Sequence, residues 1–459
     1  MKRCLACLAP LLFAAPIAHA DTPLATAAAG ALAHLKTTTA SNGWVYAALG
    51  TQSNGTGGVT ILRSTDGGAN WSPFAAYSAF DSDYNGVDLV VSGNDEASLV
   101  LDVAVVKSPS GPTSTLTVDR YDGASGTPLG TAFALFSTTH IKDVAIASDY
   151  RKPGVGTSPY SVAIAWSRFT PSQDEIGYAV STDGGATYAT TRTVAGTSAT
   201  FGRVALAYGR SASGSNGRYY VAWERFAAVD DVDGSICESR NTSTVSSAFI
   251  TPVTVNRAPG SSNDPCTPPG APAPTECDAG SDPCPEFPVV AATEGACRAP
   301  SIAVQYSDVD NPIGSNTTLV TATCDRAPGL GNVVGFYNMR GHYTNFWGQF
   351  APTPVGSGDE RDAHVVYDDH DATFLLTYVD RAAHALVFKS NGFEFAAPNA
   401  WTLGNANYAD LVDGIDDAAP RVGFAPRSGL PNFAWIRHAA ANDVAYFDRG
   451  DRIFADGLD

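Results

Sequence analysis

Arginines recur in this sequence at regular places, and their chemistry suits the binding of a negatively charged or strongly polar ligand. A guanidinium stays charged at physiological pH and can pair with a carboxylate through two parallel hydrogen bonds. One set of arginines ends a short apolar run, namely Arg168, Arg225, Arg326, Arg381 and Arg437. A second set lies at or just before the start of another run, namely Arg203, Arg298, Arg361 and Arg421. Acidic residues accompany both sets, namely Asp88, Asp143, Glu224, Asp325, Asp362 and Asp380.

Three of these arginines stand in the sequence Ala-Trp-x-Arg, which also has a purely structural interpretation. The copies end at Arg168, Arg225 and Arg437. On a β-strand, residues two apart point to the same face, so the Trp and the Arg of each copy can pack together. Packing between neighbouring sheets would explain both side chains, and the sequence leaves packing and ligand binding open as the role of these arginines.

A short acidic segment could hold a metal ion. Asp81, Asp83 and Asn85 place oxygen ligands at alternate positions before a glycine, as in the first half of a calcium loop. The carboxylate that closes such a loop is missing, because the twelfth position is Ser92. Ordinary Asx turns explain the same residues. We therefore expect no cofactor, with calcium at these three residues as the alternative.

The elements that must position these side chains are short strands. Runs rich in Val, Ala, Tyr and Trp alternate with Gly, Ser, Asn and Asp, a pattern that indicates strands and turns rather than helices. One type of run begins with a polar residue, and its copies start at Asp88, Asp143, Arg203, Ser301, His364 and Arg421. These starts are 55 to 63 residues apart, except for one interval of 98 residues. In each unit, an arginine-ending run, a run with a turn motif and a shorter fourth run follow in constant order.

Four strands repeated at this period predict an all-β protein with a β-propeller fold, in which each four-stranded antiparallel sheet is one blade. We count seven units, which start near residues 33, 87, 141, 201, 298, 362 and 418; six blades is the alternative if the first unit is incomplete. The last unit shows three clear strands, so we expect residues 22–32 to add its fourth. The propeller domain is predicted to span 21–450, with a Pro/Gly/Cys-rich insertion at 256–297 and a short acidic tail at 451–459.

In a propeller, second strands end and first strands start on the same face, around the mouth of the central channel. Both sets of arginines should therefore lie on that face. We predict that they form a ligand site there with Asp143 and Glu224.

Two turn motifs are the most specific in the chain. The octapeptides 64–71 and 181–188 share a Ser-x-Asp-x-Gly-x-x-aromatic pattern, with Ser64, Asp66, Gly68 and Trp71 in the first and Ser181, Asp183, Gly185 and Tyr188 in the second. The aspartate can accept hydrogen bonds from the amides of its own turn, and glycine suits the left-handed position. Both octapeptides resemble the Asp-box of bacterial neuraminidase repeats, and each follows the third strand of its unit.

This resemblance implies a sialidase-type propeller, in which Asp-boxes are structural turns on the face away from the active site. Enzymes of that family clamp the substrate carboxylate with three arginines and carry a Phe/Tyr-Arg-Ile-Pro segment near the start of the propeller. Here the first unit, Leu35 to Gly50, contains no arginine. We therefore expect a sialidase-like propeller that binds a glycan or another extracellular ligand without turnover. A divergent glycoside hydrolase and a structural or adhesive surface protein are the alternatives.

Residues 1–20 indicate export. A basic start, an apolar stretch and the small-x-small pattern ending at Ala20 predict a signal peptide with cleavage near that residue, and hence a secreted, periplasmic or cell-surface protein. No later stretch is apolar enough to span a membrane. The formal net charge of −18 argues against nucleic acid as a partner. The oligomeric state stays open.

The cysteines fit an exported protein. The six beyond residue 20 are Cys237, Cys266, Cys277, Cys284, Cys297 and Cys324. An even number in an exported chain predicts disulfides, with the pairing left open. No Cys-x-x-Cys occurs, and no histidine lies between Cys237 and Cys324, which argues against zinc.

Overall fold

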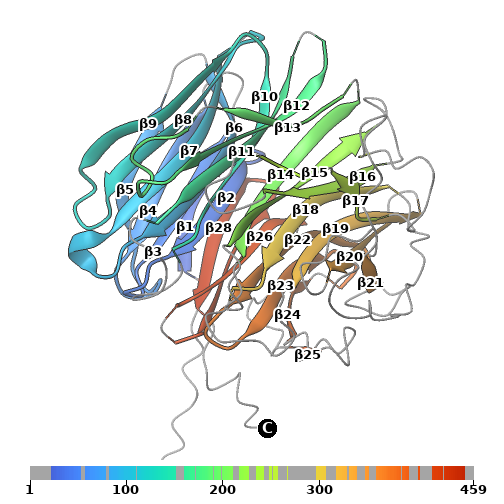
Figure 1. Ribbon diagram of the computed structural model, residues 1–459. Helices are drawn as coiled ribbons and strands as arrows, with labels where there is room; N and C mark the ends of the chain where they lie inside the picture. Colours follow the sequence, from blue (N-terminus) through green and yellow to red (C-terminus); the bar gives the residue numbers. More distant parts are fainter. Residues whose placement is uncertain are drawn as a thin grey trace, which may run out of the picture.

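A four-stranded sheet with apolar side chains on both faces cannot be stable alone, because each face must be covered by another sheet. The computed structural model meets this need with seven four-stranded antiparallel sheets arranged in a ring (Figure 1). It describes residues 22–52, 57–78, 82–109, 111–150, 160–170, 172–189, 191–197, 199–209, 217–226, 234–241, 248–250, 252–256, 266, 296–306, 317–327, 330–338, 347–350, 358–383, 385–391, 402–403, 416–426 and 428–449.

The strands of each blade follow one another from the axis outward. Blades 1 and 2 are β2 (Leu32–Thr39), β3 (Val45–Thr51), β4 (Gly58–Ser64), β5 (Ser72–Ser78) and β6 (Ser82–Ser92), β7 (Val100–Pro109), β8 (Ser114–Asp122), β9 (Pro128–Ser137). Blades 3 and 4 are β10 (Ile141–Ser148), β11 (Val162–Phe169), β12 (Asp174–Ser181), β13 (Arg192–Thr197) and β14 (Thr200–Gly209), β15 (Arg218–Phe226), β16 (Ser235–Arg240), β17 (Val253–Thr254). Blades 5 and 6 are β18 (Cys297–Val304), β19 (Thr318–Ala327), β20 (Leu330–Asn338), β21 (Gly348–Phe350) and β22 (Glu360–Asp368), β23 (Thr373–Asp380), β24 (Ala385–Asn391), β25 (Thr402–Leu403). Blade 7 is β26 (Asp416–Phe424), β27 (Pro431–His438), β28 (Asn442–Arg449) and β1 (Thr22–Ala28).

The seven-blade prediction is confirmed, and the six-blade alternative is wrong. Inner strands begin at residues 32, 82, 141, 200, 297, 360 and 416, close to the predicted unit starts. The expected closing strand is also present: β1 pairs with β28, so the first described strand completes the last blade. Figure 1 shows this strand, in blue, beside the red strands of blade 7. The predicted signal peptide, most of the insertion and the acidic tail lie outside the described residues.

The core lies between the blades. Trp166, Trp223 and Trp435, the three tryptophans of the Ala-Trp-x-Arg runs, expose 1 % or less of their surface. Trp166 packs in a cluster that combines strands of blades 2 and 3, and Trp435 packs in one that combines strands of blades 6 and 7. A buried aromatic ring of this size contributes a few kcal/mol through its apolar area, so these contacts hold adjacent blades together.

Ring closure is reinforced by one carboxylate. Asp443, which is fully buried at the start of β28, accepts hydrogen bonds from the backbone N–H groups of Gly30 (3.1 Å) and Leu32 (2.9 Å). These groups belong to the turn between β1 and β2, which joins blade 7 to blade 1. His438 Nδ1 lies 2.9 Å from the same carboxylate. Desolvation opposes ionisation, but the hydrogen bonds from His438, Leu32 and Gly30 outweigh it and lower the pKa of Asp443.

The two octapeptides, residues 64–71 and 181–188, form matching turns. In the first, Ser64 Oγ donates to Asp66 Oδ1 (2.7 Å), while Asp66 accepts from the Asn70 N–H (2.9 Å) and Ser64 Oγ from the Gly68 N–H (2.7 Å). Ser181, Asp183, Gly185 and Thr187 repeat all three bonds in the second turn. The two turns follow β4 and β12, the third strands of their blades. They therefore lie at equivalent places, as the repeat predicts.

In blades 2 and 3, an arginine from the preceding blade contacts the turn that follows the third strand. Arg120 of β8 donates to the Gly184 carbonyl (2.7 Å), and Arg63 of β4 donates to the Gly123 carbonyl (3.0 Å). Arg120 is itself held by the buried carboxylate of Asp102 (2.9 Å). The turns therefore connect neighbouring blades at the outer strands, away from the axis.

Two disulfides are present among the described cysteines. Cys297 and Cys324 join the paired strands β18 and β19, and Cys237 of β16 is joined to Cys266. Cys277 and Cys284 lie outside the described residues. The one helix in the described part is the short 3₁₀ turn Glu96–Ser98, so no helix there is long and apolar enough to cross a membrane.

Replacing Asp443 with alanine should weaken ring closure. Two backbone N–H groups would lose their acceptor, at a cost of about 2–4 kcal/mol. We expect a lower midpoint of thermal unfolding and faster amide hydrogen exchange in β1. Asp443→Asn keeps one acceptor oxygen and serves as the matched control, with a smaller loss. If the amides of β1 exchange as slowly in Asp443→Ala as in wild type, this role of Asp443 is contradicted.

The Asp-box carboxylates should make stability depend on pH. The hydrogen bonds from Asn70 lower the pKa of Asp66 to about 2; the pKa of Asp183 is also about 2, because bonds from Thr187 and Ser181 outweigh desolvation. A carboxyl whose pKa is lower in the folded than in the unfolded protein stabilises the fold at pH values above its unfolded pKa, which is near 4. This stabilisation is lost as the pH falls toward the folded pKa of about 2. Asp66→Ala and Asp183→Ala should each cost about 1 kcal/mol at pH 7. Denaturant unfolding across pH should show the difference from wild type shrinking below pH 4; a constant difference would contradict the assignment.

Candidate functional site

A polar cavity of about 620 Å³ runs along the axis of the ring and is lined by all seven inner strands. We call the end at which the inner strands begin the mouth face. Because neighbouring strands are antiparallel, second and fourth strands end on this face and third strands begin there. The charged residues of the lining are Lys36, Asp88, Lys142, Asp143, Arg203, Glu224, Asp362 and Arg421.

Local irregularities aim these side chains at the axis. Each inner strand has a β-bulge near its start, such as those between Phe201 and Val204 in β14 and between Arg361 and His364 in β22. Bulges redirect a strand and its side chains. In three blades the bulge contains a non-glycine residue with positive φ, namely Ala299 (53°), Asp362 (56°) and Ala419 (49°). Such strained conformations concentrate at functional sites.

The polar residue that starts the repeated run has one structural role in four blades. Its side chain accepts a hydrogen bond from a backbone N–H of the next inner strand. The pairs are Asp88 with Ile146 (3.1 Å), Asp143 with Val204 (3.0 Å), Ser301 with Val365 (3.0 Å) and His364 with Val422 (3.2 Å). Arg421, at the matching place in blade 7, instead donates to the Leu35 carbonyl of blade 1 (3.0 Å). The same residues therefore join the blades and face the cavity.

Charges of both signs lie side by side around the axis. Lys36 lies 3.6 Å from Asp88, and Arg203 lies 3.8 Å from Asp362. Burial, helped by repulsion from Arg203, lowers the pKa of Arg421 to about 10, while the carboxylates of Asp88, Asp362 and Asp143 oppose that shift. These groups come from six different blades and almost balance in charge. Within a strongly acidic protein, the axis is thus a separate environment of both signs.

Two buried groups of the lining have shifted pKa values. Desolvation raises the pKa of Asp143, although Lys36, Arg203 and the N–H of Val204 oppose the shift. Desolvation lowers the pKa of His364, and the nearby cations Arg421 and Lys36 lower it further. His364 is therefore neutral at neutral pH, which matches its role as acceptor for the Val422 N–H. Asp143 is a carboxyl that is protonated at higher pH than an ordinary aspartate.

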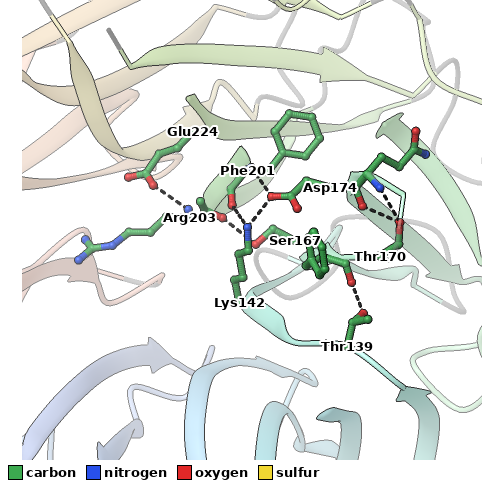
Figure 2. Close-up of polar contacts among 11 residues, drawn as sticks. Thr139, Lys142, Ser167, Thr170, Asp174, Phe201, Arg203 and Glu224 are labelled. Carbon is green, nitrogen blue, oxygen red and sulfur yellow. Dashed lines mark hydrogen bonds and ion pairs between the residues drawn. The ribbon is translucent and has the colours of Figure 1, made fainter. Parts of the chain in front are cut away.

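Glu224 holds the mouth in shape, as Figure 2 shows. Its side chain is 7 % exposed and accepts hydrogen bonds from the backbone N–H groups of Arg203 (2.9 Å) and Ala299. A Cβ on Gly202 would lie 2.0 Å from Glu224 Oε2, so this close approach requires glycine. The carboxylate thereby joins the bulges of blades 4 and 5.

The side chains of Arg203 and Lys142, both near the Glu224 carboxylate, differ in their exposure and contacts. With its backbone held by Glu224, Arg203 extends its guanidinium away from the strand, and its side chain is 62 % exposed (Figure 2). Lys142 instead bonds the Phe201 carbonyl (2.9 Å) and pairs with Asp174 of β12. Of these two cations at the mouth, Arg203 is thus the more exposed to solvent.

The structure divides the predicted arginines. It places Arg203 and Arg421 on the cavity lining with Asp143 and Glu224. The other named arginines are absent from that lining. Arg168 pairs with Glu175 (3.0 Å), Arg437 lies over the ring of Tyr446 (5.2 Å), and Arg298 lies 3.9 Å from Asp325. Arg225 is the penultimate residue of β15, and the backbone N–H of Arg381 bonds the Asp359 carbonyl. The side chain of Arg326 lies outside the described part.

Lys36 and Lys142 are the charged lining residues that the sequence analysis did not single out. Lys36 lies on the inner strand of blade 1, where the run lacks the polar-then-apolar spacing of the other units. The sequence offered one signal for Lys36: the predicted unit start near residue 33 places residues 33–39 on an inner strand, and inner strands line the cavity. The proposed calcium ligands Asp81, Asp83 and Asn85 lie outside the described side chains. Among side chains that the structure does describe, no group of three or more His, Cys, Asp or Glu residues is arranged to hold a metal ion.

Comparisons with known proteins place the chain in no family. No family model matches the sequence, and no curated protein matches it. Among solved structures, similar chain paths occur in an α-L-arabinofuranosidase of Fusarium graminearum, with TM-score 0.45, 9 % identity and coverage of 94 % of this chain and 98 % of that one. An α-L-arabinanase of Penicillium chrysogenum gives TM-score 0.45 and 8 % identity over 94 % and 98 %, and the polysaccharide lyase Uly1 gives 0.46 and 5 % over 92 % and 90 %. At this level of similarity, no residue role transfers to the present chain.

Substitution of Glu224 should destabilise the mouth. Glu224→Ala leaves the N–H groups of Arg203 and Ala299 without their acceptor in a buried place, at a cost of about 2–4 kcal/mol. Glu224→Gln keeps one acceptor oxygen and should cost less. The free energy of unfolding from denaturant titration tests this, with the exposed Glu96→Ala as control. Equal stabilities for Glu224→Ala and Glu96→Ala would refute the anchoring role.

Proposed function

We propose that this protein binds a glycan at the mouth of its central cavity and does not turn it over. The observation that supports this proposal is the convergence of fixed groups of both signs on a cavity of about 620 Å³. That volume lies within the usual range for small-molecule sites. Sugar hydroxyls both donate and accept hydrogen bonds, so a polyol is matched by carboxylates and guanidinium groups together. A polyanion would be matched by cations alone.

The state of the carboxylates supports binding without turnover. Hydrolysis of a glycosidic bond needs two carboxyl groups free to act on the substrate, one as acid and one as base or nucleophile. Here Glu224 accepts from two backbone N–H groups, and Asp88 accepts from Ile146 and pairs with Lys36. Asp362 pairs with the exposed Arg203. Each of these anions already has a partner within the protein, and the Arg203 guanidinium, although 3.8 Å from Asp362, is 62 % exposed and so accessible to a ligand.

The Asp-box turns give the finer proposal of a sialidase-like propeller. Both turns join the third and fourth strands of their blades, and third strands end on the face opposite the mouth. This is the arrangement that the resemblance implies for a structural turn. Two disulfides fit the export that residues 1–20 predict.

A divergent glycoside hydrolase is the second candidate, and Asp143 is the observation that favours it. Its carboxyl lines the cavity, and burial raises its pKa, which is the property of a general acid. In that case Asp143 would protonate the leaving oxygen, and another carboxylate of the lining would act from the other side of the sugar.

A glycan array followed by calorimetric titration of the best glycan tests binding. We expect Arg203→Ala to weaken binding roughly ten-fold or more while the unfolding midpoint stays within about 1–2 °C, because Arg203 is exposed. Arg168→Ala, whose guanidinium pairs with Glu175 off the cavity, is the matched control. If Arg203→Ala and Arg168→Ala bind as wild type does, the cavity is not the glycan site. If the wild-type protein binds protein partners alone, an adhesive role replaces this one.

Turnover is measured on the same glycans by mass spectrometry of the incubation products. We expect the glycan to be recovered intact over several hours. Release of sugar by the wild type that is lost in Asp143→Asn would overturn the non-catalytic proposal in favour of the hydrolase.

A further inference from the structure

Two phenylalanines are exposed on the mouth face. Phe136 lies near the end of β9, the outer strand of blade 2, and Phe169 ends β11, the second strand of blade 3. Their side chains are 66 % and 46 % exposed, although the strands that carry them contribute other apolar side chains to the core. Both rings are thus available for contact with a ligand on the face that carries the cavity mouth.

The two rings belong to one region that leads to the cavity. The hydroxyl of Thr139 donates to the Phe169 carbonyl, and the Phe169 N–H donates to the His140 carbonyl (3.0 Å). Thr139 follows Phe136 by three positions in the chain, so their Cα atoms are at most about 11 Å apart. The same segment continues to Lys142, which lines the cavity beside Arg203 (Figure 2). The chain from 136 to 142 therefore runs from the rim of the ring to the edge of the cavity.

We propose that Phe136 and Phe169 form an outer subsite that stacks against the sugar rings of an extended oligosaccharide. This inference rests on the glycan site proposed above. The end of that chain would occupy the cavity mouth, and the following sugars would lie over Phe169 and then Phe136. A sugar ring has a face of C–H groups, whose burial against an aromatic ring removes apolar area from water. The edges of the same sugar carry hydroxyls, which the neighbouring Thr139, His140 and Thr170 can meet.

The size and surroundings of the two rings favour a sugar chain over a protein partner. A stable protein interface buries more than about 1,000 Å² in total, with a contiguous apolar centre. Here the two rings are separate, and the chain beside them carries the hydroxyl residues Thr139 and Thr170 and the imidazole of His140, a composition that suits units repeating along a sugar chain. The proposed ligand is thus an oligosaccharide with several exposed sugars beyond the one in the cavity.

A glycan array that displays each sugar type as a series from monosaccharide to long oligosaccharide tests the subsite. The Phe136→Ala/Phe169→Ala double variant should bind the short glycans as wild type does and lose roughly ten-fold or more on the long ones. Both residues are exposed, so the unfolding midpoint should hardly change. Phe169→Trp in an otherwise wild-type protein keeps a stacking face; it should retain binding of the long glycans and report it by a change in tryptophan fluorescence.

Leu129→Ala is the matched control, because Leu129 is 53 % exposed on the same strand as Phe136 but near its opposite end. Long glycans bound equally by the double variant and by wild type, with Arg203→Ala still impaired, would overturn the subsite and leave the cavity proposal intact. No binding of any glycan by the wild type would overturn both proposals. Equal losses on short and long glycans would assign the rings to the cavity site itself and contradict a separate subsite.

Discussion

The structure depends on the need of each blade to cover two apolar faces. Side chains such as Trp166 and Trp435 are buried only because a neighbouring blade lies against them. Seven blades satisfy this need only when the ring closes, and closure requires β1 to pair with β28 across nearly the whole length of the chain. Asp443 adds hydrogen bonds at that junction, which explains why a carboxylate is buried at a strand start.

Closure also creates the site. Once the inner strands surround an axis, their bulges direct polar side chains toward it, and the same side chains bind the backbone of the next blade. Burying charges is costly unless each has a partner. The pairing of Lys36 with Asp88 and of Arg203 with Asp362 supplies those partners. The cavity is therefore polar, and the Arg203 guanidinium stays exposed beside Asp362 while its backbone N–H is held by Glu224.

Some of the periodic arginines line the cavity and others pair with protein groups away from it, and residue type alone does not distinguish the two. Arg168 and Arg437 lie one residue before the ends of second strands on the mouth face. Their guanidinium groups contact Glu175 and Tyr446. Arg203 and Arg421 sit on inner strands and line the cavity, whereas Arg298, also on an inner strand, lies near Asp325 and outside that lining. A pattern of periodic arginines cannot separate these cases, because the local path of the strand and the groups of the neighbouring strands decide what the side chain meets.

The sequence by itself determined the repeat, the number and order of strands in each blade, the closing role of residues 22–28 and the turns at Asp66 and Asp183. These features are local to one strand or turn, or they follow from the spacing of the repeated units along the chain. Only the tertiary structure decided which charged residues share the axis, which cysteines pair among those described, and that Lys36 belongs to the cavity. Such groupings join residues of different blades, and their geometry exists only after the ring has closed.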